Sequence, residues 1–226
     1  MGFGYDKVCR RPVIITCGRL TAAKGQWHLV KAFSLVKKAV PEAALMLLGD
    51  GELREGLIQL CGRLGLSVHC AGAEAPRGHE DVFLTGFRAN PYSYMARARL
   101  FAFPSLLEGL PNAVIEALAC GLPIISADCK SGPRELLAPA TDFTARAAAP
   151  EVVGAGFLMP PFPAAPVQAC AALNPLESLW AQTITGLLAD EPRLAAMKAA
   201  GDDAQVLVLT TTLAMAFPGC PSRKAA

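Results

Sequence analysis

Short apolar runs alternate with longer amphipathic segments along most of the chain. From residue 12 onward, runs rich in β-branched or large aliphatic residues are followed by segments of helical periodicity. This alternation is typical of βαβ units and predicts a doubly wound, mostly parallel α/β sheet. The runs that we predict as strands are residues 13–17, 44–49, 81–86, 100–105, 123–127 and 156–160.

The segments between these runs predict helices. They cover residues 26–40, 52–65 and 111–121, and two further helices after residue 174 divide near Asp190. In the first helix, the apolar side chains gather mostly on one side, which leaves Lys31, Lys37 and Lys38 for solvent.

Two stretches interrupt the alternation. Residues 67–82 combine Gly, Pro and charge, so we expect a long surface loop there. Residues 138–175 are rich in Ala and Pro, and we expect irregular structure broken by one strand. We therefore divide the chain into an N-terminal extension (1–11), one α/β domain (12–201) and an unassigned tail (202–226).

Composition narrows the classes of function. The chain has 226 residues, 53% of them hydrophobic, and a formal net charge of +2 without clustered Lys or Arg, which excludes a nucleic-acid binder. Eight cysteines without a Cys-x-x-Cys pair, and three histidines, predict neither a metal site nor a disulfide framework. With no signal peptide, we expect a cytoplasmic protein with reduced thiols. The apolar run at residues 204–217 is shorter than the ~20 residues of a spanning helix.

The loop after the first strand carries two fixed cations. Gly18 and Arg19 follow the strand directly, and Lys24 lies just before the helix. At the carboxyl end of a parallel strand, Arg can bind two oxygens of a diphosphate while Lys acts as a point charge. The alternative is an ordinary solvated loop. Gly49, after the second strand, fits no complete G-x-G-x-x-G pattern; it either lets a ligand approach the backbone or begins a turn.

The stretch from Ser105 to Ser126 carries two carboxylates around a turn. Gly109 and Leu110 lie at the predicted helix N-terminus, where free N–H groups favour an anionic oxygen. Glu116 lies inside the apolar helix and needs donors, which the vicinal hydroxyls of a ribose would supply, while Glu108 is a candidate for sugar hydroxyls. The alternative is a solvent-facing Glu116.

Taken together, these motifs resemble the retaining GT-B glycosyltransferases of family four. The resemblance extends over about residues 12 to 137 and rests on the following segments: Arg19 and Lys24, "GDGELR", "LTGF", and Glu108 and Glu116 in an E-x7-E motif followed by "EALACGLPIISADCKSGPREL". It implies one Rossmann-like half of a GT-B fold that binds a nucleotide-diphosphate sugar, with UDP-sugars favoured. It also implies metal-independent transfer without a cofactor, in polysaccharide or glycolipid assembly.

The same resemblance assigns roles to single residues. Arg19 and Lys24 would bind the diphosphate, Glu116 the ribose and Glu108 the transferred sugar, so Glu108, Arg19 and Lys24 are the predicted catalytic set. The other predicted substrate-binding residues are Gly18, Gly49, Phe87, Arg88, Gly109, Leu110 and Asn112, with Phe87 and Arg88 near the base.

The chain departs from this family in length. Only about eleven residues precede the first strand, whereas the family has an N-terminal domain that carries the acceptor site. We therefore expect a domain fragment, a truncated frame or a split subunit that meets its glycan or lipid-linked acceptor through a missing domain. Peripheral association with the inner membrane face and dimerisation remain open. The alternatives are a nucleotide-binding remnant without activity, a nucleotide-sugar epimerase, and a flavodoxin-like or receiver domain.

Overall fold

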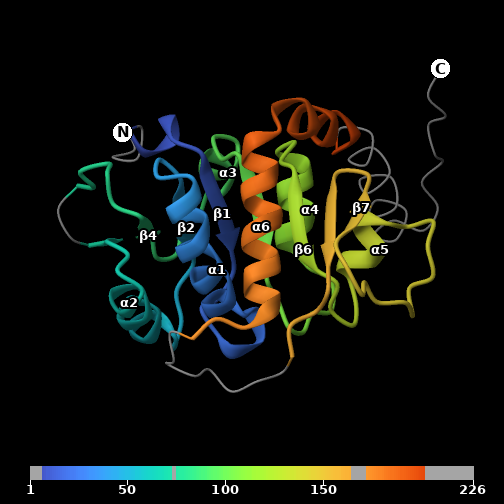
Figure 1. The fold of residues 1–226 in the computed structure, drawn as a ribbon, viewed down its shortest axis with the longest axis horizontal. Coiled ribbons are helices and arrows are strands. Elements are labelled where there is room, and N and C mark those ends of the chain that lie inside the picture. The colour runs from blue at the N-terminus through green and yellow to red at the C-terminus, as the bar shows by residue number, and fades with distance from the viewer. Residues whose placement is uncertain (1–6, 73–74, 164–171, 202–226) are drawn as a thin grey trace.

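The structure, a computed structural model, describes residues 7–72, 75–163 and 172–201 (Figure 1). Eight strands in these ranges form one sheet in the order β3-β4-β2-β1-β5-β6-β8-β7. Every pair of neighbours is parallel except β7 and β8. The strands are β1 (Val13–Cys17), β2 (Ala44–Leu48), β3 (Val68–Cys70), β4 (Val82–Leu84), β5 (Leu100–Phe103), β6 (Ile124–Ala127), β7 (Glu151–Val153) and β8 (Gly156–Met159).

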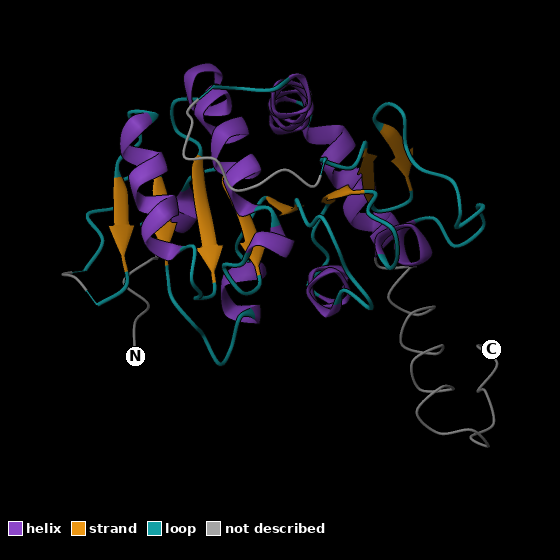
Figure 2. Cartoon of the chain, turned by 90° about the horizontal axis from the view of Figure 1, so that it is seen from below, coloured by secondary structure: helices purple, strands orange, loops and turns teal. Residues whose placement is uncertain are grey.

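Helices cover both faces of this sheet, as Figures 1 and 2 show. Their bounds are α1 (Gln26–Ala39), α2 (Arg54–Arg63), α3 (Tyr92–Met95), α4 (Asn112–Ala119), α5 (Pro133–Leu137) and α6 (Pro175–Ala189), and the short 3-10 helices are η1 (Val8–Arg10) and η2 (Ala22–Lys24). The chain is helical again at residues 191–201. None of the helices in the described ranges has the length and apolarity needed to cross a bilayer.

Two hydrophobic clusters hold the helices to the sheet. The first joins α1, α2 and α6 to one face through side chains such as Phe33, Leu57 and Trp180. The second joins α3 and α4 to the other face through Met95 and Val114. Because the central strands are buried on both faces, β2 and β5 are continuous apolar runs rather than alternating ones, and β6 is interrupted only by the buried Ser126. The predicted doubly wound α/β fold is confirmed.

The six predicted strands correspond to β1, β2, β4, β5, β6 and β8, but two strands were not predicted. β3 lies in the predicted surface loop and pairs with β4, with Val68 opposite Val82. β7 lies in the predicted irregular segment and forms a hairpin with β8. Both are edge strands of three residues with mixed burial, so neither has a long apolar signature. The predicted tail and the apolar run at 204–217 lie outside the described residues.

The prediction that Lys31 faces solvent is wrong. Lys31 is buried between α1 and α6, where its Nζ lies 3.6 Å from Glu177 Oε1 and donates to the Ala172 carbonyl. His28 Nδ1 lies 2.7 Å from the same carboxylate oxygen. The other oxygen of Glu177 closes a capping box with Asn174 at the start of α6. Lys31 is therefore buried because it pairs with the buried acid Glu177 of α6. The helical periodicity of residues 26–40 alone does not reveal this partner.

Candidate functional site

A cavity of about 410 Å³ opens at the carboxyl edge of the sheet. On one side of β1 the sheet continues to β2 and β4, and on the other side to β5, so the strand order reverses there. In open α/β sheets, ligands bind at such a switch point. Of the predicted site residues, the cavity brings together Gly18, Arg19, Gly49, Phe87, Arg88 and Glu116.

Two glycines let the loops after β1 and β2 approach closely. Gly49 has φ +137°, and a Cβ there would lie 2.0 Å from the Gly18 carbonyl oxygen. The Gly18 N–H donates to the Leu48 carbonyl, and the Gly49 N–H donates to the Gly86 carbonyl beyond β4. Gly49 is therefore required by backbone packing at the cavity, whereas Gly18 is favoured by its φ of +151°, because a Cβ there would meet only the Lys24 side chain, at 3.9 Å.

The cavity has two guanidinium groups. Arg19 is exposed, its carbonyl is fixed by Gln26 Nε2 at 2.8 Å, and none of the described acids forms an ion pair with it. Arg88 lies with its guanidinium carbon 6.0 Å from the Tyr94 ring centroid. Its Nε is buried and has no hydrogen-bond partner in the described part of the chain. Because a guanidinium only donates, these groups favour a ligand with acceptor oxygens.

Glu116 contributes the opposite charge to the same cavity. It is half-buried on α4, and burial raises the pKa of its carboxyl group. None of the described side chains forms a hydrogen bond or ion pair with this carboxylate. Burial, and then the charge of Glu116, raise the pKa of the nearby Cys17 thiol to about 11, so this thiol is neutral. Glu116 thus retains the capacity to accept from a ligand, and it faces the cavity rather than open solvent.

Lys24 and Glu108 pair with each other. Lys24 Nζ lies 2.6 Å from Glu108 Oε1, and the Glu108 side chain is only 6% exposed. The loops that carry them also join through the Leu106 N–H, which donates to the Ala23 carbonyl. The pair lies beside the cavity, because a Cβ on Gly18 would contact the Lys24 side chain. Sequence reasoning placed both residues at the site but did not predict this ion pair.

Three predicted residues lie on the turn into α4, outside the cavity lining. Leu110 is 62% exposed, Asn112 is exposed as the first residue of the helix, and Gly109 is exposed on the same turn. Conversely, the cavity is also lined by Cys17, Leu48, Asp50, Ala89 and Pro91, which were not predicted as site residues. These residues could have been predicted from their positions, because each lies at the end of a strand or in the loop after β4.

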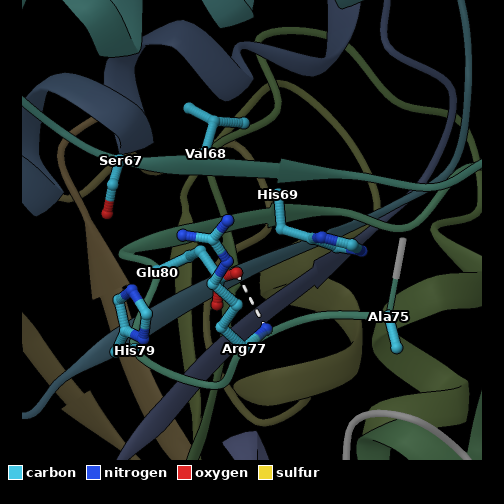
Figure 3. Close-up of a pocket in the computed structure, with 7 residues that line it drawn as sticks. All are labelled: Ser67, Val68, His69, Ala75, Arg77, His79 and Glu80. Carbon is cyan, nitrogen blue, oxygen red and sulfur yellow. Dashed lines mark hydrogen bonds between the residues drawn. The ribbon is translucent and has the colours of Figure 1, made fainter. Parts of the chain in front are cut away.

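A second cavity, of about 460 Å³, lies beside the edge strand β3 (Figure 3). Its lining includes His69, Arg77, His79 and Glu80. Here the carboxylate is already bound, because the N–H groups of Arg77 and Gly78 donate to its two oxygens at 2.9 and 2.8 Å. No cluster of His, Cys, Asp and Glu suited to a metal ion occurs in the described ranges.

Several curated glycosyltransferases are similar to this chain in sequence. An uncharacterized glycosyltransferase of Methanocaldococcus jannaschii is 42% identical over 150 residues, which cover 66% of this chain and 34% of that protein. A Campylobacter jejuni α-N-acetylgalactosaminyltransferase that acts on a diphospho-undecaprenol-linked sugar is 38% identical over 131 residues, which are 58% of this chain and 32% of the relative. The chain thus spans about a third of the length of these curated relatives.

Solved structures share the fold. The pneumococcal O-GlcNAc transferase GtfA in complex with UDP and GlcNAc aligns with a TM-score of 0.68 at 21% identity, over 91% of this chain and 34% of that one. Anabaena HepE in complex with UDP aligns with a TM-score of 0.66 at 24% identity, over 94% and 50%. The C-terminal domain of Francisella tularensis LpcC aligns with a TM-score of 0.62 at 17% identity, over 86% and 84%.

The architecture is therefore one half of a GT-B fold, as the sequence motifs indicated. The family profile described as "Glycosyl transferases group 1" matches residues 11–173, which is most of the chain. This chain belongs to the family of group 1 glycosyl transferases.

Proposed function

We propose that residues 12–201 form the donor-binding domain of a retaining glycosyltransferase that binds a nucleoside diphosphate sugar. The observation that carries this proposal is the cavity at the switch point, where two guanidinium groups and one unpaired carboxylate converge. A nucleoside diphosphate matches this set, because its phosphates are acceptors and its ribose hydroxyls are donors. The UDP complexes of the fold relatives HepE and GtfA favour uridine.

The ligand groups can be matched to residues of the cavity and of the loops beside it. Arg19 and Lys24 hold the diphosphate, Glu116 accepts from the ribose hydroxyls, and the donor-only Arg88 meets an acceptor of the base, beside Phe87. Glu108 accepts from the sugar, and the N-terminus of α4 at Gly109 and Leu110 adds N–H groups and a favourable dipole for an anionic oxygen.

The chemistry follows from these charges. The bond between the anomeric carbon and the phosphate oxygen breaks, and its electron pair leaves on the phosphate. Arg19 and Lys24 stabilise that negative charge without a metal ion. The acceptor hydroxyl adds to the anomeric carbon on the same face and gives its proton to the departing phosphate, so configuration is retained and no covalent glutamyl intermediate is needed.

Turnover is expected to require more than this domain. The curated relatives are about three times as long as the segment they share with this chain. We therefore propose that a second domain supplies the site for a glycan or lipid-linked acceptor, at the cytoplasmic face of a membrane. By itself, the chain should bind the nucleotide and transfer little or no sugar.

Calorimetric titration with UDP, GDP and ADP tests this proposal. We expect selective binding of one nucleotide, weakened about tenfold by Glu116→Ala, because an unpaired ribose diol is left behind. Glu42→Ala, at the opposite edge of the sheet, is the matched control and should bind normally. A folded chain that binds none of the three nucleotides contradicts the proposal. Release of a free epimer from a UDP-sugar without acceptor would favour the epimerase alternative.

A further inference from the structure

The loop after β6 touches the turn that carries Glu108. Ser131 Oγ donates a hydrogen bond of 2.6 Å to the Glu108 carbonyl oxygen. Gly132 has φ +93°, and a Cβ there would lie 2.3 Å from Pro111 Cδ and 2.6 Å from the Gly109 carbonyl oxygen. Two adjacent residues outside the cavity therefore contact the backbone of the turn from residue 108 to residue 111.

A buried ion pair fixes this loop at both of its ends. Arg134, on α5, donates to Asp128 Oδ2 through Nε at 3.0 Å and Nη2 at 2.6 Å, and both side chains are at most 5% exposed. The Ala147 N–H donates to the same oxygen. Arg134 also binds Glu151 of β7, and the hydrogen bonds to Glu151 and Asp128 raise the pKa of the guanidinium.

This ion pair is better suited to fixing geometry than to adding stability. Buried ion pairs are often no more stabilising than apolar residues of similar volume. Here the other oxygen of Asp128 is buried without a hydrogen-bond partner in the described chain, which adds a desolvation penalty. The ion pair instead fixes the orientation of residues 129–133. It thereby fixes the contact of this loop with the turn that carries Glu108.

Glu108 is consequently held from two sides. Its side chain is bound by Lys24, from the loop after β1, and its backbone carbonyl is bound by Ser131, from the loop after β6. Arg19 lies in the loop after β1, and Glu116 lies on α4, whose N-cap Pro111 faces Gly132. No hydrogen bond in the described structure joins Arg19 or Glu116 to residues 131 and 132. A change at Ser131 or Gly132 should therefore displace Glu108 more than it displaces Arg19 or Glu116.

We propose that Ser131 and Gly132, fixed by the Asp128–Arg134 ion pair, are positioning residues that set the place of Glu108 against the transferred sugar. This inference rests on the proposed function, and it assigns nucleotide binding and sugar recognition to different loops. The loops after β1, β2 and β4, together with Glu116 of α4, bind the nucleotide, while the loop after β6 controls recognition of the sugar.

Gly132→Ala tests the inference, with Gly65→Ala as its matched control. Gly65 also has a positive φ, of +72°, but a Cβ there would meet nothing within 4 Å, so it reproduces the backbone strain without the contact. Calorimetry should give a Kd for UDP within twofold of the original chain in both variants. The Kd for UDP-N-acetylgalactosamine or UDP-galactose, whichever the chain binds, should rise at least fivefold in Gly132→Ala only.

Ligand-observed NMR separates positioning from general damage. Saturation transfer to the sugar protons should fall in Gly132→Ala and Ser131→Ala, while transfer to the uracil and ribose protons persists. Ser131→Thr keeps the hydroxyl and should restore the sugar signals. Thermal unfolding identifies any variant that has not folded, and Ser131→Ala removes only one hydroxyl group, so it provides the test if Gly132→Ala does not fold.

The outcomes are distinct. Equal losses for UDP and UDP-sugar, or no change for either, overturn the positioning role while UDP binding by the original chain still supports the donor domain. If the folded original chain does not bind UDP, GDP or ADP, the proposed function fails and this inference fails with it.

Discussion

The cavity at the switch point and the cavity beside β3 are similar in volume and differ in the state of their polar groups. At the switch point, the Glu116 carboxylate and the Nε of Arg88 have no partner among the described residues. Beside β3, Glu80 is bound by two backbone N–H groups, and its neighbour Asp81 is bound by Lys37 and Ser67. Unsatisfied groups, rather than volume, therefore distinguish a candidate ligand site from a surface hollow.

The carboxyl pKa values follow the same division. Burial raises the pKa of Glu116, and no interaction opposes it. Burial would also raise the pKa of Asp81, but hydrogen bonds from Lys37 and Ser67 outweigh it, and the pKa is lowered. The ionised Glu116 therefore lowers the stability of the fold, whereas the ionised Asp81 contributes to it.

The largest expected effect is on folding at the switch point. Gly49→Ala should lower the free energy of unfolding by about 3 kcal/mol, because backbone atoms of Gly18 occupy the place of the new methyl group. Gly72→Ala, near the second cavity, has φ +93° but nothing within 4 Å, and should lose only about 1 kcal/mol. Urea unfolding compares the two; equal losses would mean that the close approach of the loops is unimportant.

The next largest effect is on the affinity for UDP, which should depend on the cavity at the switch point and not on the cavity beside β3. Arg19→Ala should weaken UDP binding at least tenfold, a loss of about 1.5 to 3 kcal/mol for a charged hydrogen-bonding group. Arg77→Ala removes another exposed arginine, from the second cavity, and should leave the Kd for UDP unchanged. Calorimetry measures both. A larger loss in Arg77→Ala would reverse the assignment of the two cavities.

A smaller effect concerns the satisfied carboxylate. Asp81→Asn should lower stability by about 1 kcal/mol at pH 7. Because the folded pKa of Asp81 is lowered, its contribution is present above the unfolded pKa of about 3.9 and is lost as pH falls through the folded value. Unfolding curves of the two proteins should therefore converge once the pH has fallen below the lowered folded pKa of Asp81. A difference that persists in acid would assign the effect to packing.

The smallest effect has the opposite sign. Glu116→Gln should raise stability at pH 7 by a few tenths of a kcal/mol, because the half-exposed carboxylate is only weakly penalised by burial. Since its folded pKa is raised, the carboxyl favours folding below the unfolded pKa of about 4.3, and that advantage disappears as pH rises. Glu42→Gln, on the surface, should change little. Lower stability in Glu116→Gln at pH 7 would indicate a structural role.

Much of the fold could be predicted because its central strands are buried on both faces. Residues 44–48 are apolar without interruption, residues 13–17 are apolar apart from Thr16, and burial of the strands explains why. β3 and β7 escaped prediction because a three-residue edge strand needs only a neighbour with free backbone groups, not an apolar pattern. The burial of Lys31 depended on Glu177, which lies far along the chain.

Part of the candidate site could be predicted because the sheet is parallel. Residues that directly follow parallel strands, such as Gly18, Arg19 and Gly49, share an edge of the sheet by topology, so their meeting could be anticipated. The pairing of Lys24 with Glu108, and the contact of Ser131 with the Glu108 carbonyl, depend on loop geometry that no periodicity encodes.

The packing of α6 on α1 shows that the segment that resembles the family is shorter than the segment that is needed to fold. The family match ends at residue 173, one residue before the capping box of α6. A chain cut there would lose Trp180 and Ile184, and would expose Trp27, Phe33 and their neighbours on α1 to solvent. Such a fragment would contain every residue of the candidate site and should still aggregate, because the helix that seals its core lies outside the matched segment.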